Sequence, residues 1–388
     1  MRRLVPLVSA IVLVESVFFS ALTPLLPYYE AEFGLSKQAG GILTAVYAGG
    51  AIVGAIPAGA LAARLGVKAA VTLGLLVMIV ASVAFGLADS VGALTVSRFV
   101  QGIGSALAWT GGLAWLVAAA PRERRGELIG VAMGAAVAGA LLGPVLGWVA
   151  TEVGTAPAFA AVALVDFALL AWAWATPAAR PEAPQRLREV RAAVHQPAIL
   201  QGFWFVTLAA LLLGVISVLG PFRLDELGWS AFAISAAFFV SAGVEAALAP
   251  VQGRWSDRRG AAEPIRVGLV ASIATTVGLL LVDASWPFIA LVVVAGVSYG
   301  FFWVPGTAIL SDGTERAGLD LAFGAMLLNL AWAPGNVVGA AAGGALGDAV
   351  GDEAVYVAVI GICACSLAVG TRVRTGAASG ARAREAPR

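Results

Sequence analysis

The chain has 388 residues, of which 60% are hydrophobic and only 12% are charged. An average soluble domain carries about twice this fraction of charge, and roughly a quarter of the chain surface stays exposed even in a folded protein of about 300 residues. The composition therefore excludes a soluble enzyme and a disordered chain, and it predicts a membrane protein with many spans.

The predicted elements are apolar runs, each long enough to cross the roughly 30 Å hydrocarbon core of a bilayer as a helix. Six of them lie in the first half of the chain, near 5–27, 38–62, 69–88, 91–119, 128–151 and 156–175. Six more follow a polar stretch, near 198–220, 230–252, 265–284, 286–309, 321–346 and 353–371. The first run begins with Met1-Arg2-Arg3, but no small-residue cleavage site follows it, so we expect it to persist as a first span. The sequence thus predicts an all-α membrane protein with twelve transmembrane helices.

The basic residues predict how these spans are oriented. Of the 24 Lys and Arg residues, all except Lys37, Arg98 and Arg223 lie at the termini or in the loops that share a side with them. Because Lys and Arg stay on the cytoplasmic side during insertion, we expect both termini to be cytoplasmic. The predominance of Arg over Lys is typical of a GC-rich bacterial genome, so the expected location is a bacterial plasma membrane.

The chain divides at its centre. We expect an N-terminal six-helix bundle over 1–176, a cytoplasmic linker over 177–197, a C-terminal six-helix bundle over 198–372 and a basic cytoplasmic tail over 373–388. In the linker, Leu187, Val190 and Val194 recur at helical spacing among arginines. This pattern fits either a short amphipathic helix that lies on anionic headgroups or a plain solvated linker.

Two short motifs recur at about half the chain length. The run from Gly59 to Gly66 matches 253–260, with Gly, Arg and Gly in register, and Glu123-Arg124-Arg125-Gly126 matches 315–318. Each pair falls in equivalent loops of the two halves. Two parallel six-helix repeats around an axis along the membrane normal form a transporter architecture, with the binding site near the midplane between the halves.

Four motifs along the chain resemble those of one family. The loop after the second run carries Gly59, Leu61, Arg64, Gly66 and Lys68, with Ala63 before the arginine, and its copy carries Gly253, Asp257, Arg258 and Gly260. The other three motifs are Arg98-Phe99-Val100-Gln101-Gly102-Ile103-Gly104 in the fourth run, Gly139, Gly143, Pro144 and Gly147 in the fifth, and Thr23-Pro24-Leu25-Leu26-Pro27 at the end of the first. With these motifs the chain resembles the major facilitator superfamily, and in particular its twelve-helix drug:proton antiporters.

The resemblance implies a role for each motif. In the family, the loop motif is a cytoplasmic gating motif, and its acid helps to hold the cytoplasmic side closed. Ala63 removes this acid from the first copy, whereas Asp257 retains it in the second. The glycine motif of the fifth span implies close helix packing, and the motif around Arg98 is typical of proton-coupled members.

Four ionisable residues fall well inside predicted spans, where a charge at the bilayer centre costs about 2.5–3.5 kcal/mol. We predict proton-coupling or substrate-binding roles for Glu15, Arg98, Glu245 and Asp166. Arg98 shares a polar or small helix face with Gln101. It could hold a nearby carboxylate in its charged form, or it could be a structural arginine that extends toward the outer interface.

Glu15 lies in the middle of the first run, beside a stripe of Ser and Thr residues. A carboxyl group in an apolar interior is stable when it binds either a proton or a substrate cation, and it cannot bind both. This exclusion is the basis of antiport, although Ser hydroxyls could instead satisfy Glu15. Glu245 shares a helix face with Ser241 and is the second candidate. Asp166 has apolar neighbours, so it fits a helix-packing role as well as a functional one.

A further set of polar and aromatic residues lies in spans that border the central cavity of the family. We expect the following residues to line it: Gln101, Trp109, Asn329, Trp332, Tyr299 and Trp303. Aromatic faces bind cations, at about 0.5–2 kcal/mol each. The alternative for the aromatic residues is packing between helices or contact with lipid.

These features predict a secondary transporter that exports small amphipathic, cationic compounds in exchange for protons. The alternative is a nutrient or metabolite symporter or uniporter on the same scaffold. The expected partners are a small-molecule substrate, protons and the lipid bilayer, with no nucleic acid, and we expect the monomer to function. We expect no enzyme activity, metal or cofactor. The chain has a single histidine, His195, and no P-loop, and its two cysteines, Cys363 and Cys365, point to different helix faces.

Overall fold

The computed structural model describes residues 3–121, 124–178, 195–319 and 321–370, and the elements within these ranges are α-helices. Most of the predicted linker and the whole predicted basic tail lie outside the described residues. The helices of the first half are α1 (Leu4–Ala21), α2 (Leu25–Phe33), α3 (Lys37–Leu65), α4 (Val67–Gly86), α5 (Val91–Ala119), α6 (Arg125–Val153) and α7 (Thr155–Ala175). Those of the second half are α9 (Pro197–Glu226), α10 (Ala231–Arg259), α11 (Ala262–Leu281), α12 (Ser285–Arg316), α13 (Leu321–Val350) and α14 (Asp352–Gly370).

The long helices follow the predicted apolar runs. Within the described ranges, 11 helices are long and apolar enough to cross a membrane, judged by length and composition. The 30-residue helix α13 lies at the position of the eleventh predicted run. The predicted all-α class with many spans is therefore confirmed.

The first span is interrupted, and the prediction of one continuous helix over 5–27 is wrong at its end. Helix α1 ends at Ala21, and α2 begins at Leu25, on the other side of Pro24. A proline has no N–H to donate, and it disfavours helical geometry in the residue before it. The last turn of α1 is therefore a true helix end, whose carbonyl groups can accept hydrogen bonds from other elements.

The two copies of the loop motif have the same backbone shape. Gly66 joins α3 to α4 with φ 93° and ψ 157°, and Gly260 joins α10 to α11 with φ 80° and ψ 160°. Residues with a side chain rarely adopt a positive φ, so glycine lets one helix end and the next begin within one or two residues. The repeated glycine thus encodes a repeated turn.

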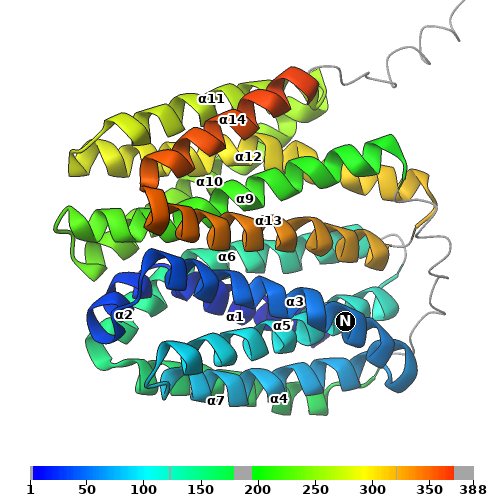
Figure 1. Cartoon of the computed structure of the whole chain (residues 1–388). Helices are drawn as coiled ribbons and strands as arrows, with labels where there is room; N and C mark the ends of the chain where they lie inside the picture. Colours follow the sequence, from blue (N-terminus) through cyan, green and yellow to red (C-terminus); the bar gives the residue numbers. More distant parts are fainter. Residues whose placement is uncertain (1–2, 122–123, 179–194, 320, 371–388) are drawn as a thin grey trace, which may run out of the picture.

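Equivalent helices of the two halves pack in equivalent pairs (Figure 1). In the first half, α1 packs on α6, α3 on α5 and α4 on α7, and in the second half the corresponding pairs are α9 with α13, α10 with α12 and α11 with α14. The halves meet along two seams, α3 against α13 and α6 against α10. The predicted arrangement of two six-helix repeats is therefore present.

The glycine motif of α6 lies against α1. A Cβ atom at Gly139 would collide with the carbonyl oxygen of Leu13, and one at Gly143 would collide with Ser20. Gly147 lies equally close to Ala21. Helix α6 continues through Pro144. Small residues at this spacing let two helix backbones approach closely, which fits the predicted helix-packing role.

We expect Gly143→Ala to destabilise the folded protein, because the added methyl group overlaps Ser20. Overpacking of this kind costs about 1–3 kcal/mol. Gly134→Ala is the matched control on the same helix, since nothing lies within 4 Å of a Cβ there, and Ala is the better helix former. The melting temperature in detergent should fall for Gly143→Ala only. Equal melting temperatures for the two variants would contradict the close packing of α1 and α6.

Candidate functional site

Four predicted site residues meet inside the first half. Glu15 of α1, Asp166 of α7, and Arg98 and Gln101 of α5 are 2%, 0%, 1% and 0% exposed. Glu15 lies close enough to Asp166 for their charges to interact. The sequence pattern offers no reason to place Asp166 inside the bundle, yet the structure buries it fully and within range of the charge of Glu15.

Arg98 is held by the end of α1. Its guanidinium group donates hydrogen bonds to the carbonyl oxygens of Phe18 at 2.9 Å and Phe19 at 2.7 Å, and to Gln101 Oε1 at 3.1 Å. The same group lies 4.5 Å from the centre of the Tyr47 ring, within the range of a cation–π contact. A cation stabilises the carboxyl end of a helix dipole, so Arg98 caps α1.

The two buried acids are left without hydrogen-bond partners. None of the four carboxyl oxygens of Glu15 and Asp166 has a partner among the described residues. The hydroxyl groups of Tyr47 and Ser105 lie next to Glu15 without meeting hydrogen-bond geometry. A buried, unpaired carboxylate is costly, so these acids require either protons or a bound cation.

Glu245 belongs to a separate site in the second half. It is half-buried on α10 and lies near Gly296 of α12, beside Ser241. The Ser241 hydroxyl donates to the carbonyl oxygen of Val292 at 3.3 Å. The neighbours of Glu245 thus come from α10 and α12, whereas those of Glu15 are Asp166, Ser105 and Tyr47 of the first half.

An aromatic contact joins the two halves next to the buried acids. The ring of Phe19 lies 5.0 Å from that of Trp332 of α13 and 5.5 Å from that of Tyr47. Phe19 and Trp332 are both partly exposed, whereas Tyr47 is buried. Phe19 carries no signal in the sequence, because the residues of its own helix do not indicate which residue lies opposite it across the seam.

The other predicted cavity residues are spread over several environments. Tyr299 is buried in the apolar core of the second half, and Trp303 packs on that core from the side. Trp109 and Asn329 are half-buried. Asn336, on the same helix as Trp332, is fully buried, and both polar atoms of its side chain lack a partner in the described structure.

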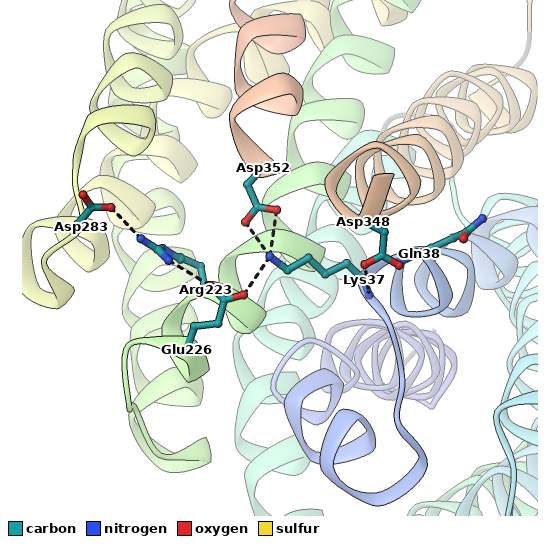
Figure 2. A network of polar contacts seen from close by, with 7 residues as sticks. All are labelled: Lys37, Gln38, Arg223, Glu226, Asp283, Asp348 and Asp352. Atoms are coloured by element: carbon teal, nitrogen blue, oxygen red, sulfur yellow. Dashed lines mark hydrogen bonds and ion pairs between the residues drawn. The ribbon is translucent and has the colours of Figure 1, made fainter. Parts of the chain in front are cut away.

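A second polar cluster ties the halves together where α3 begins, and we call this the Lys37 end of the bundle (Figure 2). Lys37 Nζ lies 3.0 Å from Glu226 Oε1 of α9 and 3.0 Å from Asp352 Oδ2 of α14. Asp348 of α13 accepts hydrogen bonds from the backbone N–H groups of Lys37 at 3.2 Å and Gln38 at 2.9 Å. Asp348 thus caps the amino end of α3 from the other half.

The Lys37 cluster extends within the second half through Arg223. Its guanidinium group pairs with Glu226 at 3.1 Å and with Asp283 at 2.9 Å. Glu30 of the short helix α2 faces the same acids, and burial followed by the charge of Asp225 raises the pKa of Glu30. The cluster therefore contains several acids whose negative charges are compensated by ion pairs with Lys37 and Arg223.

The opposite end, where α3 meets α4, is here called the Arg64 end. Arg64 and Asp257 of the predicted gating motifs are exposed there and have no ion pair in the part of the chain that the structure describes. Lys68 instead donates to the carbonyl oxygens of Trp174 at 2.7 Å and Thr176 at 2.9 Å, which holds the end of α7. Polar contacts thus join the halves at the Lys37 end and not at these gating residues.

Comparison with known proteins assigns the chain to a family. The sequence matches the profile of the Major Facilitator Superfamily over residues 8–336 and over 203–387. The chain belongs to the major facilitator superfamily. It is therefore a membrane transporter by family, as the motifs predicted, and the match does not distinguish the drug:proton antiporter branch.

Two superfamily relatives have sequences similar to part of the chain. The MFS-type transporter ppzB of Metarhizium rileyi (strain RCEF 4871) is 30% identical over 121 residues, which cover 30% of this chain and 25% of the relative. The MFS-type transporter ppzB of Metarhizium majus (strain ARSEF 297) is 31% identical over 122 residues, covering 30% and 26%. The match spans about a quarter of the length of these curated relatives.

Two solved structures share the superfamily fold. A bacterial homologue of the human lysosomal transporter Spinster, in an inward-facing and unoccupied conformation, superposes with a TM-score of 0.78 at 14% identity, over 95% of this chain and 96% of that one. A POT family transporter in complex with 5-aminolevulinic acid gives a TM-score of 0.70 at 15% identity, over 94% of each chain. At these identities the likeness shows the fold alone.

Proposed function

We propose that this superfamily member is a proton-coupled exporter of small amphipathic, cationic compounds that works by alternating access. The observation that carries the proposal is the pair of buried acids, Glu15 and Asp166, whose carboxyl oxygens have no partner within the described structure. The proposal places the protein in a bacterial plasma membrane as a functional monomer, with both termini and the Arg64 end on the cytoplasmic side.

The chemistry follows from the cost of burying a negative charge. A carboxylate in this interior is neutralised either by a proton or by the positive charge of a substrate. A proton that enters from the outer side displaces the substrate cation, and the neutral site then returns to face the cytoplasm. Tyr47, Phe19 and Trp332 offer aromatic faces beside the acids, which suit an organic cation.

The number of acids matches the energy that cation export requires. One proton moving down 100 mV releases about 2.3 kcal/mol, and one pH unit adds about 1.4 kcal/mol. When one monovalent cation leaves for each proton, the voltage contribution cancels, and one pH unit sustains only about a tenfold gradient. Strong export of a cation therefore requires a second proton, for which Asp166 and Glu245 are the candidates.

The direct test is a substrate panel in a bacterial host that lacks its own efflux pumps. Cells that express the chain should tolerate higher concentrations of lipophilic cations, and energised cells should accumulate less of a fluorescent cation than cells that express Glu15→Gln. Neutral and anionic analogues of the same size serve as controls. Energy-dependent accumulation of a nutrient, without extrusion of any cation, would contradict export and support the symporter alternative.

A further inference from the structure

A hollow of about 370 Å³ runs along the last turns of α10. It is lined by Val251, Arg254, Trp255, Arg258 and Arg259. The spacing of these residues places them on one helix face. The hollow is separate from the buried acids and lies at the Arg64 end.

Two guanidinium groups in this hollow are uncompensated. Arg259 pairs with Glu263 of α11 at 2.9 Å, whereas Arg254 and Arg258 have no ion pair or hydrogen bond within the described part of the chain. Asp257 is their neighbour in sequence, yet it is exposed and pairs with neither. The hollow therefore offers positive charge in a fork geometry that matches a phosphate group.

The rest of the lining is apolar. Val251 is exposed, and Trp255 packs edge-on against Phe301 of α12, with ring centres 5.6 Å apart. The Trp255 indole N–H is buried and has no acceptor among the described residues. Charge at one end and an apolar wall along the same helix suit an amphiphile better than a free inorganic anion.

The position of the hollow identifies the amphiphile. The Arg64 end carries the loops with most of the basic residues, which the positive-inside rule places at the cytoplasmic leaflet. That leaflet holds the anionic lipids of the membrane, and basic residues at its surface attract them. We propose that this hollow binds an anionic phospholipid, with its phosphate on Arg254 and Arg258 and its acyl chain along Val251 and Trp255.

Native mass spectrometry of the purified full-length chain tests the proposal. Phosphatidylglycerol and phosphatidylcholine with the same acyl chains are titrated separately. We expect retention of phosphatidylglycerol, and about 30-fold weaker binding in Arg254→Gln/Arg258→Gln, with binding of phosphatidylcholine unchanged. The matched control is Arg124→Gln/Arg316→Gln, which removes the same charge at the same end, where these arginines already bond to Glu127 and to the Asp312 carbonyl.

Each outcome decides the assignment. Equal weakening in both double variants would overturn it, because the effect would then come from net charge alone. Displacement of phosphatidylglycerol by millimolar inorganic phosphate would also overturn it, since the hollow would then be a site for soluble anions. If the double Gln variant does not melt like the wild type without lipid, Arg258→Gln alone should bind phosphatidylglycerol about fivefold more weakly, and wild-type binding by that variant would reject the proposal.

Discussion

Glu15→Gln is expected to abolish substrate-driven proton movement in proteoliposomes with an imposed pH gradient. The amide has nearly the same shape as the protonated acid, but it cannot release a proton, so position 15 stays neutral in every state. Cation binding should weaken as well, because the bound charge loses its partner. A pH-sensitive dye inside the vesicles measures the proton movement that follows addition of the substrate found in the panel.

Two further variants serve as comparisons for Glu15→Gln: a second candidate coupling residue and a surface control. Glu245→Gln should lower the proton flux without abolishing it, because Glu245 lies in the other half and is only half-buried. Glu32→Gln, on the exposed face of α2, removes an acid from the protein surface and should behave as wild type. Unchanged flux in both Glu15→Gln and Glu245→Gln would reject these residues as the coupling sites.

Lys37→Met is expected to open the Lys37 end. The variant removes both ion pairs that Lys37 makes between the halves, while Arg223 stays paired with Glu226 and the backbone N–H groups of residues 37 and 38 stay bonded to Asp348. Partly buried ion pairs contribute up to about 1 kcal/mol each, so the loss of two pairs should raise the open population by up to about 30-fold. The measurement is labelling of Thr44→Cys by a membrane-impermeant maleimide. Thr44 is buried near the start of α3, and Cys363 and Cys365 are first replaced by Ala.

The control for this experiment uses the same cluster. Asp283→Asn removes an ion pair that lies wholly within the second half and leaves Lys37 bound to its partners. Its labelling rate should equal that of the parent protein. If Lys37→Met also labels at the parent rate, the ion pairs of Lys37 do not hold the two halves together.

Hydropathy predicts most of the fold because each span must be apolar along its own length. The distribution of basic residues predicts the orientation of the spans in the membrane. The structure gives a physical reason for the three basic residues that lie outside the predicted cytoplasmic loops and termini. Lys37 and Arg223 both lie in the ion-pair cluster of the Lys37 end, and Arg98 is buried on the carbonyl groups of α1. These three residues depart from the basic-loop pattern because each is fixed by specific partners.

Features that depend on distant partners are not predictable from a single helix. The faces of α7 are all apolar around Asp166, so only its packing against the rest of the bundle reveals that this acid is buried near Glu15. Asp348 caps a helix 310 residues away in sequence, and Phe19 meets Trp332 of the other half. The sequence prediction ran the first span through Pro24, so both the break there and its consequence, a helix end available to Arg98, depend on the three-dimensional structure.

Proton release on substrate binding tests the exclusion between protons and cations most directly. Purified protein in weakly buffered detergent solution is mixed with saturating substrate, and a pH indicator reports the protons that leave. By reciprocal linkage, a cation that binds the acidic site must expel protons from acids that were protonated beforehand. We therefore expect up to about one proton per substrate for each such acid in the wild type and a clearly smaller release in Glu15→Gln. Tight binding without any proton release would contradict the mechanism, even though the transporter fold would stand.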